Sequence, residues 1–488
     1  MHKILLAHNP LCNLDEAIHV FPVALMTLAR LISFTCPRLM HNLQCGAQVA
    51  FVSLLWGITF LNKHNNPTGI ARKLGKLSHD RMQRLRKNSV VTATVIMLEL
   101  FQQALELMTT TPHGQTMLIL DDVLIPKPFA KCIQGAYWDH DHALKMPCFG
   151  IRVVVLLWSN GSFAIPVAFL VWHKRQNPMP SFAPRRYRSK NELARILVYW
   201  VYRKGLCFHV LTFDTWYAKK ENLILFNRLG IMWVTALESN RWIRLPLATP
   251  RKNPQGKPTT HENLRCEDLA ARYPMREHYS NYPALDLRAK VIAMDLTTKI
   301  RNLKLVIVKD YLRSLSFAEE AAVKAALAKS KKRRRDPNKY LLTNCLGANV
   351  SWIIRCYKRR YQIEWVFREA KQHLALGACS ARKFNAVTQH ISLSFLGFVS
   401  LQQLHGNLPG EVKNDLTLGE YRRQLQELYR IRTGESVYLV NLSEICESVD
   451  TILNDVLSKV EHLPKSDKPP DDIEHHKTLS YMNLSLAA

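Results

Sequence analysis

The sequence predicts a mixed α/β protein preceded by a helical N-terminal part, and three observations lead to this prediction. Residues 1–112 carry Leu, Ile, Phe and Met at helical spacing, with few glycines. From Met117 onward, short apolar runs alternate with amphipathic stretches, a pattern typical of a sheet covered by helices. An Asn-Gly pair also separates two apolar runs within residues 149–172, which is a strong signal for a β-hairpin.

After the hairpin, the expected elements alternate between helix and strand. Ser189–Gly205 is an amphipathic helix with a glycine at its end, and it is followed by a strand, a helix and a strand at 208–214, 220–230 and 231–241. A Pro-rich polar loop is expected next, at 247–264, followed by two strands within 288–310. A helix with a basic end is expected at 318–336 and a short strand at 339–344. Two helices follow, at 357–373 and 380–406. The segment 463–477 is too polar to pack and is expected to be a solvated tail.

Residues 65–87 resemble a helix-turn-helix in the N-terminal part. Thr68 is expected to cap a short helix, and Ser78 a second one that carries Arg81 and Arg84. Two short helices around a glycine turn, the second of them basic, favour contact of Arg81 and Arg84 with DNA. An ordinary helical hairpin is the alternative interpretation.

The composition points to a polyanionic partner and to a protein outside the membrane. The chain of 488 residues has 67 Lys and Arg against 39 Asp and Glu, a formal net charge of +28, which favours nucleic acid binding. Eleven cysteines without a C-x-x-C pair indicate reduced thiols in the cytoplasm. The apolar window 47–61 is too short to span a bilayer, and 151–172 is interrupted by the hairpin turn. We therefore expect a cytoplasmic, nucleoid-associated location.

Acidic residues end two of the predicted strands and occupy one late helix. Asp121 and Asp122 close the run LILDD, Asp214 closes VLTFD, and Glu364 lies in the helix. Carboxylates that meet at one edge of a sheet would form an oxygen-rich site, which suits Mg²⁺ or Mn²⁺. Each acid alone also has an ordinary interpretation, as a turn residue, a helix cap or a salt-bridge partner of Arg360. The segment DHDH at 139–142 is interpreted as a polar turn.

The helix of Glu364 combines the acid with cations on one stripe. Each residue of an α-helix turns about 100°, so Tyr357, Arg360, Glu364 and Lys371 fall on the same side. Such a stripe suits a surface that holds a phosphate chain beside a metal ion.

The order of the acids resembles the ribonuclease H-like core of DDE transposases. The spacing Tyr357-x2-Arg360-x3-Glu364-x6-Lys371 is similar to the Y-R-E-K signature of cut-and-paste insertion-sequence transposases, and the resemblance covers roughly 115–405. It implies a core that is divided by an insertion. The expected regions begin with a DNA-end-binding helical domain at 1–112 and the first part of the core at 115–244. The insertion is expected at 245–338 and the second part of the core at 339–405. A helical C-terminal region with its tail is expected at 406–488.

The same resemblance implies the roles of the site residues. Asp121, Asp214 and Glu364 would bind two Mg²⁺ or Mn²⁺ ions. The family commonly has Asp-x-Thr at the first acid, and Val123 at the threonine position leaves Asp122 open as the alternative. Because strand residues alternate between faces, only one of the two acids can join Asp214.

The remaining signature residues, Tyr357, Arg360 and Lys371, would contact phosphates of the transposon end. The implied chemistry is phosphoryl transfer without a covalent protein intermediate. Water attack at the element's end frees a 3′-OH, which the same site directs onto target DNA. The implied partners are terminal inverted repeats, target DNA and a second copy of the chain. A domesticated, non-catalytic DNA-binding protein and a structure-selective nuclease on the same fold are the alternatives.

Overall fold

The structure is a computed structural model that describes most of the chain between Ile32 and residue 431. The described residues are Ile32 and 36–61, 66–74, 78–87, 91–112, 114–127, 130, 132–141, 145–175, 187–252, 257–297, 300–309, 338–379, 381–406 and 416–431. The predicted helix at 318–336 and the predicted tail at 463–477 lie outside these residues.

The described part of the N-terminal region is helical, as predicted. Its helices are α4 (Pro37–His41), α5 (Cys45–Phe60), α6 (Pro67–Leu74), α7 (His79–Leu85) and α8 (Ala93–Thr110). Ser78 caps α7 by accepting the Asp80 N–H, as expected. The predicted cap of α6 is wrong, because Asn66 accepts the Gly69 N–H at 2.8 Å and Pro67 opens the helix. Proline suits a first helical position, since its missing N–H has no partner there in any case.

The apolar helix α5 is covered by other helices. It packs against α15 (Phe384–Gly406), α7 and α17 (Leu418–Ile431), and the buried Arg422 of α17 donates from Nε to the Thr59 carbonyl. No helix within the described ranges combines the length and apolarity that crossing a membrane requires.

A buried acid links α4 to α8 and makes the stability of this helical part depend on pH. Glu99 accepts the Leu39 N–H at 3.1 Å, and burial raises its pKa to about 7, against opposing effects of that hydrogen bond and Arg38. Because folding raises the pKa of Glu99, the stability that this carboxyl contributes is fully present below its pKa in the unfolded chain. That contribution is lost as the pH rises through 7. We expect Glu99→Gln to raise the Tm at pH 8 and to leave it nearly unchanged at pH 4, as measured by thermal unfolding. Equal shifts at both pH values would contradict this assignment.

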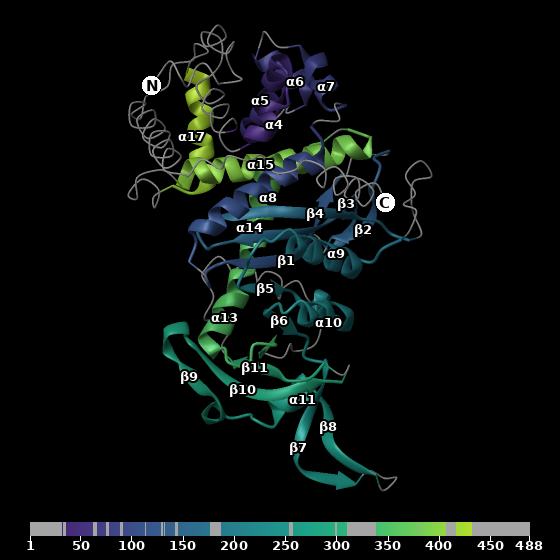
Figure 1. Ribbon diagram of the computed structural model, residues 1–488, viewed down its shortest axis with the longest axis vertical. Helices are drawn as coiled ribbons and strands as arrows, with labels where there is room; N and C mark the ends of the chain where they lie inside the picture. Colours follow the sequence, from purple (N-terminus) through teal and green to yellow (C-terminus); the bar gives the residue numbers. More distant parts are fainter. Residues whose placement is uncertain are drawn as a thin grey trace, which may run out of the picture.

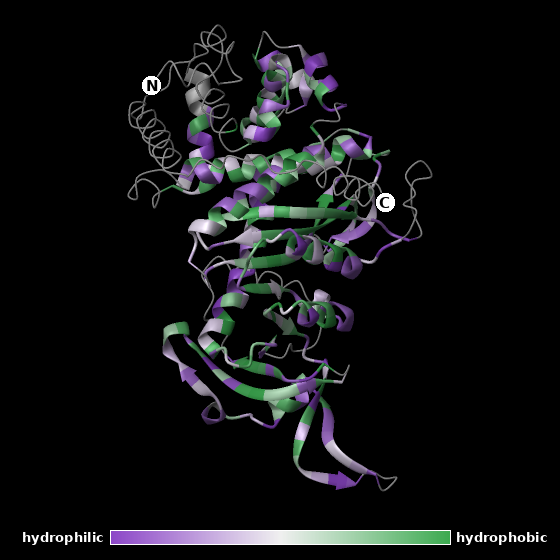
Figure 2. Cartoon of the chain, viewed as in Figure 1, coloured by the Kyte–Doolittle hydropathy of each residue, from purple (hydrophilic) through white to green (hydrophobic). Residues whose placement is uncertain are grey.

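The central sheet has the strand order and connections of a ribonuclease H-like core, which confirms the predicted fold class. Its strands run in the order β4-β3-β1-β5-β6, with β1 antiparallel to β3 and parallel to β5. The elements of this core are β1 (Met117–Pro126), β3 (Met146–Ser159), β4 (Ala164–Trp172), α9 (Lys190–Arg203), β5 (Val210–Phe213), α10 (Lys220–Arg228) and β6 (Trp233–Leu237). In Figure 2, long stretches of these core strands are coloured as hydrophobic.

The hairpin and the helix ends follow the predicted signals. Asn160 and Gly161 lie between β3 and β4, where Gly161 has φ +101° and the Asn160 side chain accepts the N–H of Ser162 and Phe163. Ser189 and Glu192 form a capping box at the start of α9. The prediction of a polar turn at 139–142 is wrong for its described part, since Tyr137–Asp141 forms β2, which pairs with β3.

Later strands of the chain extend the sheet beyond β6. The order continues β6-β12-β11-β10-β7-β8, with β9 paired to β10. These strands are β7 (Trp242–Lys252), β8 (Pro258–Arg265), β9 (Ser280–Tyr282), β10 (Leu287–Leu296), β11 (Leu303–Lys309) and β12 (Lys339–Thr343), with α11 (Cys266–Ala271) after β8. The two predicted strands within 288–310 and the short one at 339–344 are thereby confirmed.

The Pro-rich segment 247–264 was expected to be a loop, and this prediction is wrong for the described residues. Residues 247–252 belong to β7 and residues 258–264 to β8, an antiparallel pair that projects from the body of the molecule (Figure 1). Prolines are tolerated there because the pairing shifts register between Pro246 and Arg251, and Pro258 is the first residue of its strand.

The late helices cover the face of the core sheet opposite α9. The predicted single helix at 357–373 consists of α13 (Val350–Arg359) and α14 (Tyr361–His373), which meet at Arg360. The junction keeps helical backbone angles but is tightened, since the Arg360 N–H bonds to the Tyr357 carbonyl at 3.1 Å. The helix α14 packs against β1 and β4 of the sheet and also against α15.

Candidate active site

Asp121 and Asp214 lie on neighbouring strands at the point where parallel pairing stops. The last pair between β1 and β5 is Leu120 with Phe213, so the two aspartates are the next residues on either strand. The prediction that Asp121 and Asp122 end their strand is wrong, because β1 continues to Pro126. Its further residues remain paired with β3 after β5 has ended.

Arg360 joins Asp121 to Glu364. Its Nη1 donates to Asp121 Oδ2 at 2.9 Å and its Nη2 to Glu364 Oε1 at 2.6 Å. The guanidinium also lies 5.7 Å from the Tyr357 ring centroid and 5.1 Å from that of Tyr361. Burial lowers the pKa of Arg360, but Tyr357, Asp121 and Glu364 together raise it well above its usual value, so the guanidinium stays charged.

The surroundings of Asp121 and Asp214 disfavour the charged form of both carboxyls. Burial raises the pKa of Asp121 well above its usual value, and Asp214, Asp122 and Glu364 add to the rise against Arg360. Burial likewise raises the pKa of Asp214, with Arg360 opposing and Asp122 adding to the rise. Asp214 Oδ1 accepts the Trp216 N–H at 3.0 Å and caps the short helix η2 (Thr215–Tyr217). Two partly buried acids on neighbouring strands favour a cation beside them.

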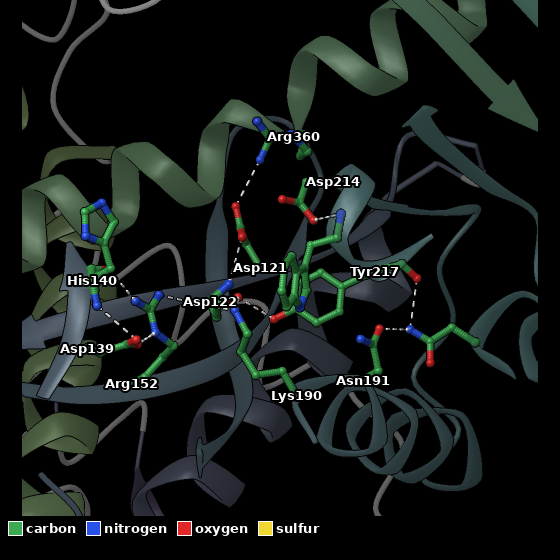
Figure 3. A network of polar contacts seen from close by, with 12 residues as sticks. Asp121, Asp122, Asp139, His140, Arg152, Lys190, Asn191, Asp214, Tyr217 and Arg360 are labelled. Atoms are coloured by element: carbon green, nitrogen blue, oxygen red, sulfur yellow. Dashed lines mark hydrogen bonds and ion pairs between the residues drawn. The ribbon is translucent and has the colours of Figure 1, made fainter. Parts of the chain in front are cut away.

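Asp122 points to the opposite face of β1, as alternation predicts. Its carboxylate accepts hydrogen bonds from Arg152 at 2.7 Å, Lys190 at 3.0 Å and the Tyr217 hydroxyl at 2.7 Å. Burial opposes ionisation, but Lys190 and Arg152 outweigh it and lower the pKa of Asp122. Figure 3 shows Asp121 directed toward Arg360, whereas Asp122 is directed toward Tyr217 and Lys190.

The predicted DNA-contacting residues divide between this site and more distant surfaces. Tyr357 is buried, with the Lys339 ammonium 5.2 Å from its ring. Lys371 is exposed on α14, within electrostatic range of Asp141 and Arg152. Arg81 and Arg84 are exposed on α7, at the end of the molecule formed by α5 to α7 (Figure 1).

Three residues of this region were not identified from the sequence, namely Arg152, Lys190 and Tyr217. They all contact Asp122, and Arg152 also donates to Asp139 of β2. The sequence feature that could have indicated such partners is the Asp121-Asp122 pair itself. If one acid faces the site, the other is buried on the far face and requires donors, because an unpaired buried carboxylate is costly.

The donor chemistry fits a hard divalent cation, although the carboxylates are separated by Arg360. Asp121, Asp214 and Glu364 offer carboxylate oxygens, the ligands that Mg²⁺ prefers. Among the residues that the structure describes, no group of three or more His, Cys, Asp or Glu side chains is close enough to hold a metal ion. The guanidinium of Arg360 supplies the positive charge between Asp121 and Glu364. An ion bound by these acids would lie beside the Arg360 guanidinium, which holds Asp121 Oδ2 and Glu364 Oε1.

Comparison with known families supports an endonuclease relationship. The model of the family described as DDE superfamily endonuclease matches residues 43–291, slightly more than half of the 488 residues. The match includes α5 to α8, Asp121, Asp122 and Asp214, and it ends before Glu364. No curated protein matches the chain.

Proposed function

Because the chain belongs to the DDE superfamily endonuclease family, we propose that it is a DNA transposase that cuts the ends of its own element and joins them to target DNA. The observation that carries this proposal is the position of Asp121, Asp214 and Glu364 around Arg360 at one edge of the parallel strands. Acids on two adjacent strands and a facing helix suit metal-dependent phosphoryl transfer, and the basic composition suits a DNA substrate.

Each acid has a distinct place in the proposed mechanism. Asp121 is the first ligand, since Asp122 is already held by three donors on the other face. Asp214 is the second ligand, and its cap to η2 holds Oδ1 in place. Glu364 is the third, and its side chain is 47% exposed, open to an approaching strand. Two Mg²⁺ or Mn²⁺ ions bound there would stabilise the attacking and leaving oxygens of an in-line displacement.

The cations of the Y-R-E-K pattern are proposed to hold the DNA backbone. Once Arg360 releases a carboxylate, its planar fork is suited to two phosphate oxygens. Tyr357 packs beside Arg360 and orients it. Lys371, Arg81 and Arg84 are exposed and would neutralise further phosphates of the terminal repeat. Pairing two ends would require two copies of the chain, so we propose a homodimer on DNA.

Transfer of a precut end distinguishes this function from its alternatives. The substrate is a duplex that carries the inverted repeat flanking the coding region and a free 3′-OH, mixed with plasmid DNA and Mg²⁺. The transposase proposal predicts covalent joining to the plasmid. Cutting of an intact end without joining would indicate a nuclease, and binding without cutting would indicate a domesticated DNA-binding protein.

A further inference from the structure

The backbone connection between the strands of Asp121 and Asp214 ends just before these residues. Ladder pairing of β1 with β5 stops at Leu120 and Phe213. Beyond that pair, within the described residues, the hydrogen bond that joins the two segments runs from the Tyr217 hydroxyl to Asp122 Oδ1 at 2.7 Å. This side-chain contact therefore links the chain after Leu120 to the chain after Phe213, where backbone pairing no longer fixes the distance between them.

The acceptor of this hydrogen bond is held from two further elements. Arg152 of β3 donates to Asp122 Oδ2 at 2.7 Å, and Lys190 at the start of α9 donates to Oδ1 at 3.0 Å. Only 8% of the Asp122 side chain is exposed. Since Asp122 directly follows Asp121 in β1, fixing Asp122 also fixes the backbone from which Asp121 projects.

The donor is held equally firmly and lies three residues after Asp214. Tyr217 ends η2, the short helix that Asp214 caps, and its side chain is fully buried. The Tyr217 carbonyl accepts from Asn222 Nδ2 at 2.9 Å, and the same amide donates to Asn191 Oδ1 at 2.7 Å. The buried ring directs the hydroxyl toward Asp122, which accepts its hydrogen bond (Figure 3).

We propose that Tyr217 and Asp122 are positioning residues, whose buried hydrogen bond sets the separation of the Asp121 and Asp214 carboxylates. The proposal rests on the proposed function, in which these two acids hold one divalent ion together. In this proposal, neither positioning residue binds the DNA or the metal itself. Partners of this kind orient the ligands themselves, and their loss typically weakens metal binding by about 10- to 100-fold.

The test variant is Tyr217→Phe, which removes the hydroxyl and keeps the buried ring. Binding of Mn²⁺ to the full chain without DNA is measured by electron paramagnetic resonance, and the Mg²⁺ dependence of terminal-repeat cutting is measured in parallel. We expect Mn²⁺ affinity to fall by about 10- to 100-fold, and the Mg²⁺ concentration for half-maximal cutting to rise by a similar factor. Cutting at saturating Mg²⁺ should largely recover, because all three acids remain.

The matched control is Tyr421→Phe, which removes the hydroxyl of another buried tyrosine, on α17 beside His405. The control should match the wild type in Mn²⁺ affinity. If Tyr217→Phe changes the Tm but leaves Mn²⁺ affinity equal to that of the control, the hydrogen bond is merely structural and the inference is wrong. If the wild type itself neither binds Mn²⁺ nor cuts DNA, the proposed function fails, and the inference fails with it.

Discussion

Replacing Asp214 by asparagine is expected to abolish metal-dependent cutting of terminal-repeat DNA while leaving the fold and DNA binding intact. Asparagine keeps a side-chain oxygen that can accept the Trp216 N–H, so η2 retains its cap. The negative charge of the carboxylate is lost, and with it a ligand of the proposed ion. Several kcal/mol of transition-state stabilisation depend on that ion, so the cutting rate should fall by about 10³-fold or more.

The measurement for Asp214→Asn is single-turnover cutting with Mg²⁺, alongside a gel-shift assay of binding to the same DNA. Asp286→Asn is the matched control. Asp286 is exposed directly before β10 with φ +49°, a conformation that asparagine also tolerates. The control should cut like the wild type. Undiminished cutting by Asp214→Asn would show that this acid is not a ligand.

Asparagine at Asp121 and at Asp122 should have opposite effects on stability and activity. Asp121 has a pKa raised well above normal, so the fold disfavours its charge, and Asp121→Asn should retain or raise the Tm at pH 8. The same variant should not cut at any Mg²⁺ concentration. Asp122 has a lowered pKa, so its charge stabilises the fold above the unfolded pKa, and that contribution is lost as pH falls.

Asp122→Asn leaves Arg152 and Lys190 without their buried counter-charge. Removing one partner of a buried ion pair typically costs about 3–5 kcal/mol, so the Tm should fall by several degrees. Because the three proposed ligands remain, cutting should persist at high Mg²⁺. The checks are thermal unfolding at pH 8 and cutting across a Mg²⁺ titration. Full loss of cutting in Asp122→Asn with retained activity in Asp121→Asn would reverse the assignment of the first acid.

The fold was largely predictable because its signals are local. The turn at Asn160-Gly161 and the capping box at Ser189 depend on neighbouring residues, and both elements form where expected. The hairpin of β7 and β8 was missed because its prolines, read alone, indicate a loop. Their compatibility with strands depends on a register shift and on the pairing of β7 with β8.

The candidate site was predictable in its residue types but not in its contacts. Alternation along β1 placed Asp121 and Asp122 on opposite faces, but it could not say which face would hold Asp214. The faces are distinguished by contacts with residues far away in sequence. Arg360 donates to Asp121 on one face of β1, and the Tyr217 hydroxyl donates to Asp122 on the other. The stripe on one helix likewise could not predict that the chain tightens at Arg360, whose guanidinium turns toward the carboxylates.

The proposed phosphoryl-transfer site is tested most directly by locating Mn²⁺ in crystals of the full chain bound to terminal-repeat DNA. Anomalous scattering from manganese identifies the ions independently of the protein model. We expect one ion between Asp121 and Asp214 and a second that involves Glu364, with Arg360 moved from at least one carboxylate onto a DNA phosphate. Manganese bound only elsewhere, with Arg360 still joining Asp121 to Glu364 beside the bound strand, would contradict the proposed site.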